Sequence, residues 1–485
     1  MNPKLFYKEC FNNIFSQKTF FRYYGFEKKY SDLKKFYSNF LRVIKYNERL
    51  RIVTFSDKNF EMYASIASIF LSNNVWIPLS NNLPINRLIN ILEKSKPNIL
   101  ILSKKSKLSK DKKFNNFLKK NKIKPITYDQ INSIETPEIK IKERNINEKN
   151  LSMIFFTSGS TGDPKGVCIT YKNFISCFFA KKKFLYKDNK DFVFGDYHDP
   201  SFVISLVIFF PCLYLAGIIA PSQNIIENLN PVNHMENNKV NILITVPSTI
   251  NSIMNLRGKL KLNLKLMIMC GEPFSLKLAN YIFNKIRPKN LYNFYGATEV
   301  GPWIFYHRCI KSDLKKFSSF DYMPVGKPLG QTKMKIINQE LFVSGPMLSN
   351  GYLNKRQNEG VFVNIKGTRW YKTNDQIVTH NTKFLIKGRM DKVVKIQGYR
   401  VDLNDIESNL KKINGVDDAI SYLKDKNNSK ILMCTIKSKI IKNEEDITKK
   451  IAKMIPYYMV PKKFYILKKF PLNRSGKVDR KKIIF

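Results

Sequence analysis

Short apolar runs with β-prone side chains alternate with longer helical stretches as far as about residue 385. Four of these runs read RIVTF, NILIL, NILITV and KLMIM, at residues 51–55, 98–102, 241–246 and 265–269. Strands that alternate with helices are typical of α/β layers whose sheets are largely parallel. The pattern therefore predicts the α/β class, with a large N-terminal domain of layered, mostly parallel sheets and helices over residues 1–388.

The pattern changes after Arg389. Residues 393–396 read as a short strand, and Asp402 is the expected cap of a helix with one apolar face formed by Leu403, Ile406, Leu410 and Ile413. Strand-like runs follow at 418–422 and 431–436, and then a helix at about 445–454. We expect a small C-terminal α+β domain over residues 391–485, joined to the first by a hinge at Asp391.

The most apolar segment is SFVISLVIFFPCLYLAGIIAP, at residues 201–221. A membrane span is one interpretation, because the length is sufficient. However, Pro211 interrupts the segment and no basic flank follows it. A buried helix that ends near Pro211, followed by a buried strand, explains the segment better. We therefore predict no membrane span.

The charge of the chain is strongly positive, with 84 Lys and Arg against 38 Asp and Glu among 485 residues and a formal net charge of +46. Nucleic-acid binding is one interpretation. The Lys-rich stretches at 104–122 and 181–183 lack the interleaved aromatic residues of single-strand binders, and Lys is abundant even in plain helical stretches. We favour codon bias and predict no nucleic-acid partner, while a basic surface would also attract an acidic protein.

The seven cysteines are scattered, form no CxxC pair, and are accompanied by four dispersed histidines. This spacing suggests neither a zinc ribbon, a disulfide framework nor a cluster of metal ligands. The N-terminal sequence MNPKLFYKEC has no apolar core of signal-peptide length. We therefore expect a cytoplasmic protein.

The strongest local motif is FFTSGSTGDPKGV at residues 155–167, which follows a β-like run. Small residues leave backbone N–H groups free to face phosphate oxygens, with hydroxyls and one lysine beside them. The motif is not a Walker A loop, and a flexible turn is the alternative. The phosphate-binding candidates are Thr157, Ser158, Gly159, Ser160, Thr161, Gly162 and Lys165.

This loop resembles the phosphate loop of the adenylate-forming superfamily, which includes acyl-CoA synthetases, luciferases and amino-acid adenylation domains. Further segments resemble the motifs of that superfamily in its own order. They are WIPL at 76–79 with Pro84 and Arg87, NFYGATE at 293–299, ELFVSGPMLSNGY at 340–352, YKTND at 371–375, GRMDKVVKIQGYRVDLNDIE at 388–407 and PLNRSGKVDR at 471–480.

The resemblance implies ATP and Mg²⁺ and assigns roles to particular residues. Glu299 would help to hold Mg²⁺, Thr298 would contact the α-phosphate, and Lys477 would bridge the carboxylate and the α-phosphate in the transition state. Asp375 would accept from the ribose hydroxyls, with Arg389 nearby. Adenine would pack on Tyr295, and the adenine segment comprises Gly271, Asn293, Phe294, Tyr295, Gly296 and Ala297. A surface ion pair is the alternative for Asp375, and a solvated tail lysine the alternative for Lys477.

The segment YHDPS at 197–201 resembles the motif of members that activate amino acids, in which an Asp pairs with the α-ammonium of the substrate. Asp199 takes that place here, and a helix N-cap is the alternative role. His198 falls where the family has an aromatic residue that moves between the two half-reactions. It is also compatible with a packed ring.

Cys270 lies in a Cys-Gly-Glu sequence that resembles D-alanine–carrier protein ligases, and a buried core residue is the alternative. By the motifs, the substrate pocket comprises Asp199, Pro200, Val203, Thr249, Ile268, Cys270, Phe294, Pro302 and Trp303. Phe294 and Trp303 are large, and the set has no base and no second acid. A small, uncharged amino acid is therefore expected.

Three positions depart from the family pattern. Asn374 and Gln339 stand where glycine is usual, and Gln397 where arginine is common. Asn tolerates left-handed backbone, so Asn374 need not distort the turn. Gln397 removes a charge near the hinge, which leaves the details of the second half-reaction open.

The implied function is ATP-dependent formation of an aminoacyl-AMP, followed by rotation of the small domain about Asp391 and transfer to the thiol of phosphopantetheine. Because the sequence ends five residues after the last matched motif, the acidic carrier protein is expected as a separate chain. The first alternative is an acyl- or aryl-CoA ligase that uses free coenzyme A. The second is a non-catalytic scaffold that binds nucleic acid through its charge.

Overall fold

A computed structural model of the chain describes residues 3–44, 49–135, 139–159, 162–185, 191–254, 260–380, 382–426, 429–441, 443–471 and 478–483. The chain forms two compact units. The first comprises Met1–Asn81, Ser95–Phe155 and Gly166–Met390, and the second comprises Asn82–Lys94, Phe156–Lys165 and Asp391–Phe485. The α/β class with a large N-terminal and a small C-terminal part is confirmed.

One sheet of the first unit has six strands in the order β6-β5-β3-β4-β7-β8. The pairs β3/β4, β3/β5, β5/β6 and β4/β7 are all parallel. The strands are β3 (Arg51–Phe55), β4 (Val75–Leu79), β5 (Ile99–Leu102), β6 (Lys124–Thr127), β7 (Leu151–Thr157) and β8 (Lys165–Thr170). The early helices are α1 (Pro3–Asn13), α2 (Tyr30–Ile44), α3 (Phe60–Leu71), α5 (Lys112–Lys120) and α6 (Tyr128–Asn132).

The second sheet has nine strands in the order β15-β14-β13-β12-β11-β9-β10-β1-β2, with a parallel centre and antiparallel edges. The strands are β1 (Thr19–Tyr23), β2 (Phe26–Lys29), β9 (Val193–Asp196), β10 (Ile218–Pro221), β11 (Ile242–Thr245), β12 (Leu266–Cys270), β13 (Leu291–Tyr295), β14 (Phe305–Arg308) and β15 (Lys327–Pro328). The helices of this region are α7 (Tyr171–Leu185), α8 (Ile204–Tyr214), α9 (Ile225–Leu229), α10 (Val232–Asn237), α11 (Pro247–Asn251), α12 (Leu276–Tyr281) and α13 (Asp313–Lys316).

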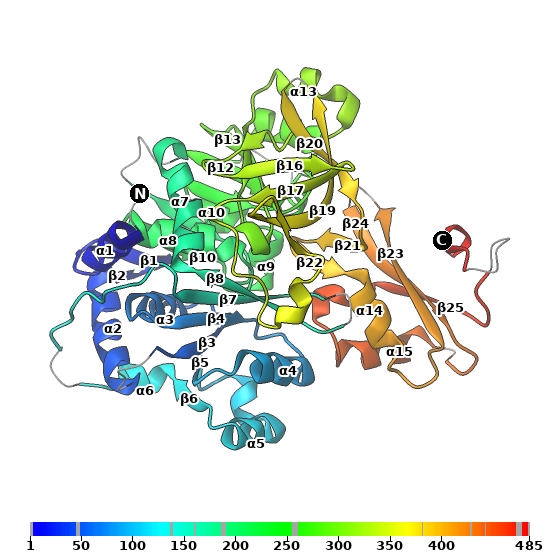
Figure 1. Cartoon of the computed structure of the whole chain (residues 1–485). Coiled ribbons are helices and arrows are strands. Elements are labelled where there is room, and N and C mark those ends of the chain that lie inside the picture. Colours follow the sequence, from blue (N-terminus) through cyan, green and yellow to red (C-terminus); the bar gives the residue numbers. More distant parts are fainter. Residues whose placement is uncertain are drawn as a thin grey trace. The chain divides into compact units, whose positions relative to one another are not determined.

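A layer of helices joins these two sheets (Figure 1). Helix α3 packs on β3 and β4, α8 packs on β9 and β10, and α1 contacts α3, α7 and α8. The shared core is rich in aromatic rings, and Phe6 of α1 packs against Phe70, Phe174, Phe178 and Tyr214. Aromatic side chains bury large areas, so this layer supplies much of the hydrophobic stabilisation of the first unit.

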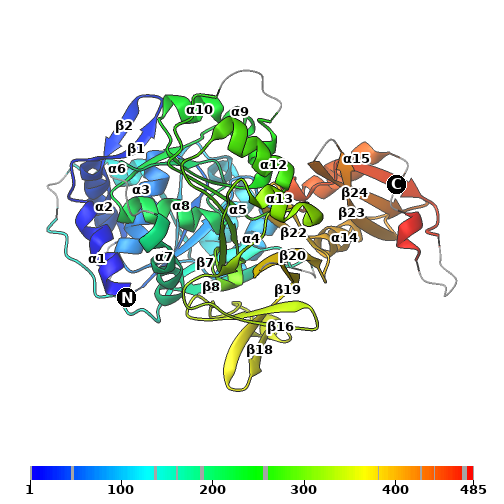
Figure 2. The same ribbon diagram turned by 90° about the horizontal axis from the view of Figure 1, so that it is seen from above.

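A third, antiparallel sheet completes the first unit and is drawn in yellow in Figure 2. It comprises β16 (Lys333–Ile337), β17 (Glu340–Ser344), β18 (Phe362–Ile365), β19 (Thr368–His380) and β20 (Lys383–Arg389). Strand β20 ends next to the point at which the chain leaves the first unit. The sheet therefore places the 371–375 motif beside Arg389, since Asp375 is paired with Arg389 in the β19/β20 ladder.

The second unit contains a two-stranded and a three-stranded sheet around its own core. Its elements are α4 (Ile85–Ser95), β21 (Val393–Ile396), β22 (Tyr399–Asp402), α14 (Leu403–Leu410), β23 (Asp418–Lys426), β24 (Ser429–Lys437), α15 (Glu444–Ala452) and β25 (Lys463–Leu467). The segments Asn82–Lys94 and Phe156–Lys165 were expected in the large domain but belong to this unit, and two of their contacts explain why. Arg87 forms a two-pronged ion pair with the fully buried Asp405, at 3.2 and 2.8 Å. The Ser158 hydroxyl donates to the carbonyl of Arg400.

The predicted strands are all present, and Asp402 caps α14 through the N–H of Asn404. The predicted end of a helix near Pro211 is wrong, because α8 continues through Pro211 to Tyr214. A proline inside a helix costs about 3 kcal/mol, but every residue from Ser205 to Tyr214 is buried, and that packing outweighs the lost hydrogen bond. No helix among the described residues is long and apolar enough to cross a membrane.

Candidate functional site

The phosphate-loop candidates lie between β7 and β8, and the loop from Phe156 belongs to the second unit. A side chain at Gly159 would place its Cβ 2.1 Å from the carbonyl oxygen of Asp163, so only glycine fits this turn. The Ser158 hydroxyl binds the backbone of β22: it donates to Arg400 O at 2.9 Å and accepts from the N–H of Asp402 at 3.1 Å. Thr157 and Lys165 end and begin the flanking strands, and Gly162 has a φ of 81°. Ser160 and Thr161 lie outside the described residues.

The adenine segment at 293–297 begins within β13 and continues into the turn after it, in the first unit. Asn293 is buried and donates from its amide to the carbonyls of Pro324 and Met323, at 2.9 and 3.4 Å. A Cβ at Gly296 would lie 2.3 Å from Pro302 O, so the chain turns there only because a side chain is absent. Ala297 precedes the short 3₁₀ turn of Thr298–Val300, which carries Thr298 and Glu299. Both residues are buried.

Glu299 is fully buried, and its Oε1 accepts a hydrogen bond of 2.8 Å from the hydroxyl of Tyr352. A buried carboxylate is costly unless it is paired, and the Tyr352 hydroxyl is one of the partners of Glu299. Mg²⁺ is usually held by one or two carboxylates together with phosphate oxygens and water. The described residues contain no cluster of three His, Cys, Asp or Glu side chains that would hold a metal alone. Glu299 therefore fits a metal that is shared with phosphates.

Asp375 has both carboxylate oxygens in hydrogen bonds. Arg389 donates to Oδ1 at 2.7 Å, and the Tyr295 hydroxyl donates to Oδ2. Asp375 is 6% exposed, so this is not a surface ion pair. An ionised carboxylate offers about four acceptor sites, which leaves capacity for two hydroxyl donors. Asn374 has a φ of 57°, in agreement with the expectation that Asn accepts left-handed backbone there.

The strand β12 ends at Cys270, beside Gly271 and Glu272. Gly271 has a φ of 81°, a conformation in which glycine is favoured. The carboxylate of Glu272 accepts from both the N–H and the hydroxyl of Ser248, at 2.8 and 3.1 Å. These bonds hold the start of α11, which carries the pocket candidate Thr249, against the end of β12.

Asp199 lies in the turn after β9, and three donors surround its carboxylate. The hydroxyls of Ser80 and Ser56 lie 2.6 and 3.4 Å from Oδ2, and the N–H of Ser201 lies 2.9 Å from Oδ1. Asp199 does not cap α8, because the N-cap residue of that helix is Val203. These three donors are neutral. They orient the carboxylate of Asp199, and none of them is a cation that would balance its charge.

His198 stands beside Asp199 and keeps a neutral ring. Burial lowers its pKa to about 4, against the opposing charge of Asp196, and Lys58 lowers it further. Its Nε2 atom is buried without a hydrogen-bond partner. The ring is therefore a packed, uncharged wall next to Asp199 rather than a second cation.

The apolar candidates come together in one core cluster. Cys270 pairs with Phe294 in the parallel β12/β13 register, and Ile268 lies two residues earlier on the same face. The rings of Phe294 and Trp303 pack with centroids 4.5 Å apart. Val203 packs against the same cluster, while Pro200 accepts from Ser205 at the start of α8. Cys270 is buried, as are all seven cysteines, and none is in a disulfide.

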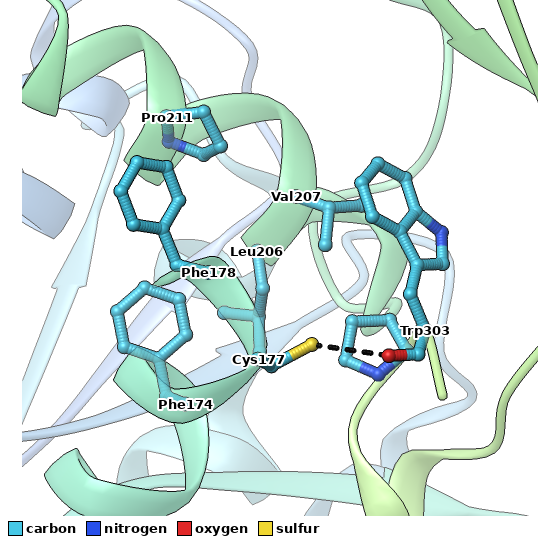
Figure 3. A pocket seen from close by; sticks show the side chains of 8 residues that line it. Phe174, Cys177, Phe178, Leu206, Val207, Pro211 and Trp303 are labelled. Carbon is cyan, nitrogen blue, oxygen red and sulfur yellow. Dashed lines mark hydrogen bonds between the residues drawn. The ribbon is translucent and has the colours of Figure 1, made fainter. Parts of the chain in front are cut away.

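A small apolar cavity lies behind Trp303 (Figure 3). Its volume is about 10 Å³, which is the space of a single water molecule. It is lined by Phe174, Cys177, Phe178, Leu206, Val207, Pro211, Pro302 and Trp303, and the thiol of Cys177 lies 3.6 Å from the carbonyl oxygen of Trp303. The cavity is too small for an amino acid. Two of the residues that line it, Pro302 and Trp303, are also candidates for the substrate pocket.

Two other candidates concern the second half of the reaction. Asp391 is the first residue of the second unit after Met390, and its Oδ1 accepts from the N–H of Val393 at 3.2 Å. This local turn is compatible with a hinge and equally with a structural bend, so its role stays a prediction. Lys477 lies outside the described residues.

Sequence reasoning missed Ser56, Ser80, Lys58, Asp196 and Tyr352 as neighbours of the site. Ser80 directly follows the WIPL run and Tyr352 ends the 340–352 block, so their motifs marked the regions but not the partners. No sequence signal connects Ser56 or Lys58 with a residue about 140 positions away.

Two family models match the chain. The AMP-binding enzyme model matches residues 17–353, and the model of the AMP-binding enzyme C-terminal domain matches residues 405–477. Among curated proteins, the D-alanine–D-alanyl carrier protein ligase of Staphylococcus haemolyticus is 26% identical over 84% of both chains. The ligase of the same name from Listeria monocytogenes is 24% identical over 96% of this chain and 95% of its own.

Solved structures share the fold. The adenylation domain AlmE of Vibrio cholerae, in complex with glycyl-adenosine-5′-phosphate, superposes with a TM-score of 0.82 at 19% identity and covers 100% of this chain and 97% of its own. The o-succinylbenzoate CoA synthetase of Bacillus subtilis gives a TM-score of 0.83 at 19% identity and covers 98% of both chains. At these identities the likeness concerns the fold alone.

Proposed function

The chain belongs to the AMP-binding enzyme family, and we propose that it activates a small amino acid with ATP and transfers it to the phosphopantetheine thiol of a carrier protein. In the first step the substrate carboxylate attacks the α-phosphorus of ATP, and pyrophosphate leaves. In the second step the thiol sulfur attacks the acyl carbon, and AMP leaves with the bonding electron pair. The enzyme is an amino acid–carrier protein ligase.

The observation that carries the amino-acid assignment is the environment of Asp199. Its carboxylate is oriented by Ser56 and Ser80, and it lies next to the neutral ring of His198. A carboxylate in such a setting pairs well with the α-ammonium of an amino acid, whereas a fatty acid offers no cation. The naming of relatives as D-alanine–D-alanyl carrier protein ligases supports the same class of substrate.

The proposed substrate has a small, uncharged side chain. Four of the residues assigned to the pocket, Ile268, Cys270, Phe294 and Trp303, belong to one apolar cluster, and the last two rings pack against each other. Alanine, in either configuration, glycine and serine are the first candidates. An apolar pocket discriminates by only about 1–3 kcal/mol for each methylene group, so close neighbours of the preferred substrate should react slowly.

Each part of ATP, and Mg²⁺, can be assigned to residues of suitable charge and hydrogen-bonding capacity. We assign the ribose hydroxyls to Asp375, the adenine ring to the face of Tyr295, and the phosphates to the loop that begins at Thr157. Glu299 would hold Mg²⁺, which would neutralise phosphate charge during attack by an anionic carboxylate. Lys477 would supply a further positive charge at the carboxylate and the α-phosphate.

The proposed acceptor is an acidic carrier protein rather than free coenzyme A. The names of the relatives support a carrier, and the net charge of +46 suits an acidic partner. Location in the cytoplasm, where ATP is abundant and the seven free thiols would remain reduced, stays a prediction.

The decisive experiment is ATP–pyrophosphate exchange with a panel of amino acids, followed by loading assays with phosphopantetheinylated carrier protein and with free coenzyme A. Exchange that depends on alanine, glycine or serine, with loading of the carrier, is the expected result. Exchange that depends only on a fatty or aromatic acid, with transfer to coenzyme A, would instead establish an acyl-CoA ligase. Exchange confined to arginine or glutamate would contradict the assigned pocket.

A further inference from the structure

A buried lysine lies beneath the turn that carries Asp199. Lys58 is only 9% exposed, and its ammonium donates to the carbonyl oxygen of Asp196 at 3.2 Å and to the hydroxyl of Ser222 at 3.3 Å. Its backbone has a φ of 52°, which is unfavourable for a residue with a side chain. A long cationic side chain held inside a protein in a strained backbone conformation is expensive, so its position calls for a reason.

Ser56 and Lys58, which lie in one turn, both form hydrogen bonds to the turn that carries Asp199. The turn after β3 carries both Ser56, which donates to Asp199, and Lys58, which donates to the backbone at Asp196. The carbonyl of Lys58 in turn accepts from the side-chain amide of Gln223 at 3.3 Å. Strands β3 and β9 belong to different sheets, so these contacts fix the ammonium site across the layers of the first unit.

Asp196 is the second part of this arrangement. It is 1% exposed, and its carboxylate accepts from the Tyr63 hydroxyl at 2.6 Å and from the N–H of His198 at 3.1 Å. The carboxylate therefore holds the backbone of the residue directly before Asp199. A buried carboxylate needs a compensating positive charge nearby.

Lys58 supplies that charge. Burial lowers the pKa of its ammonium, and the charges of Asp196, Asp199 and Glu227 oppose this fall. Four further titratable groups face this region, and burial favours the neutral form of each: Tyr63, Tyr197, His198 and His234. Lys58 is thus the cation among two carboxylates of the turn, Asp196 and Asp199.

We propose that Lys58 is a positioning residue for amino-acid recognition, which balances the charge of Asp196 and holds the turn so that Asp199 alone remains for the ammonium of the substrate. This inference rests on the proposed function and deepens it. It predicts that the ammonium site depends on a pair of buried charges that never touch the substrate.

The test compares wild type, Lys58→Met, Asp196→Asn and the double variant in amino-acid-dependent pyrophosphate exchange. Lys58→Met should raise the KM for the amino acid about tenfold or more and change the KM for ATP less than twofold. Asp196→Asn should also raise the amino-acid KM, because the freed ammonium of Lys58 then competes for Asp199. The double variant removes both charges and should regain an amino-acid KM within about threefold of wild type.

Lys122→Met is the matched control, because Lys122 has a similar φ of 55° but is exposed, and it should behave as wild type. Ser222→Ala is a milder second variant that should shift the amino-acid KM in the same direction. An unchanged amino-acid KM in folded Lys58→Met, equal changes in both KM values, or a double variant worse than either single one would overturn the inference.

Thermal melting of the same proteins separates this inference from the proposed function. If wild type activates no amino acid, the proposed function fails. The Tm values of the variants then test by themselves whether Lys58 and Asp196 balance each other's charge. Each single charge removal should lower Tm, and the double variant should recover most of the loss. Additive losses of Tm would show that Lys58 and Asp196 act independently.

Discussion

The guanidinium of Arg389 lies 2.7 Å from Oδ1 of Asp375, and Oδ2 of the same carboxylate accepts from Tyr295. Arg389 also donates to the carbonyl of Thr373 at 3.1 Å, so it clamps the whole turn that presents Asp375. Arg389 stands two residues before Asp391, where the second unit begins. The proposed ribose contact and the proposed hinge are therefore neighbours along one short stretch of chain.

Asp375→Asn should raise the KM for ATP by about tenfold or more and leave the KM for the amino acid nearly unchanged. The amide loses the charge-assisted bonds to Arg389 and presents only one acceptor oxygen. Steady-state exchange kinetics with each substrate varied in turn measure this. Asp446→Asn, at an exposed helical ion pair, is the control and should have no effect. An unchanged KM for ATP would remove Asp375 from the nucleotide site.

Asp199→Ala should severely weaken amino-acid activation while ATP binding persists. Loss of one partner from a buried, hydrogen-bonded charge pair costs about 2–5 kcal/mol, so the specificity constant for the amino acid should fall by roughly 30- to 5,000-fold. Ser80→Ala should cause a smaller fall of the same kind, because it loosens the carboxylate without removing its charge. Activation of the wild-type substrate by Asp199→Ala with an unchanged KM would reduce Asp199 to a residue that only shapes its turn.

Lys477→Ala should cripple adenylation and largely spare transfer from supplied aminoacyl-AMP. A donor aimed at charge that develops in the transition state is worth a few kcal/mol, about 100- to 1,000-fold in rate. Single-turnover assays of each half-reaction measure the two effects separately. Lys482→Ala, at an exposed lysine five positions later in the sequence, is the control. Exchange at the wild-type rate in Lys477→Ala would refute the assignment.

The stability of the fold should fall as the pH is lowered from about 6.5 towards 4, in part through His198. Burial lowers the pKa of folded His198 to about 4. In this pH range the unfolded chain binds a proton on this ring and the folded chain does not, so acid favours unfolding. Denaturant titrations at pH 7.5 and 4.5 should show a loss about 1–3 kcal/mol smaller in His198→Gln than in wild type. Equal losses in the two proteins would contradict a buried, neutral ring.

Asp391→Pro should separate the two half-reactions. Proline holds φ near −65° and prevents the backbone change that a hinge must absorb. Exchange should stay close to normal while loading of the carrier protein stops. If Asp391 only shapes a local turn, both activities should fall together with Tm. Normal carrier loading by a well-folded Asp391→Pro protein would move the pivot elsewhere.

Most of the fold was accessible from local pattern. Apolar runs of four to six residues became strands because they satisfy β-propensity and burial together, and Arg51–Phe55 and Val393–Ile396 match their predicted bounds. One exception was Pro211, where a local rule predicted the end of a helix. Burial on all sides kept α8 intact, and such burial depends on neighbouring elements that the segment itself does not encode.

The candidate site divides in the same way. The sequence by itself determined the order and identity of the motifs, because each motif depends on a backbone conformation that a short segment encodes. The turns at Gly159 and Gly296, where no side chain fits, are examples. Only the tertiary structure decided which distant groups meet: Ser80 with Asp199, Tyr352 with Glu299, and Lys58 with the Asp196 turn. The physical reason is that charge balance and hydrogen bonding in the interior depend on distances across packed sheets and helices, and spacing along the chain carries no record of those distances.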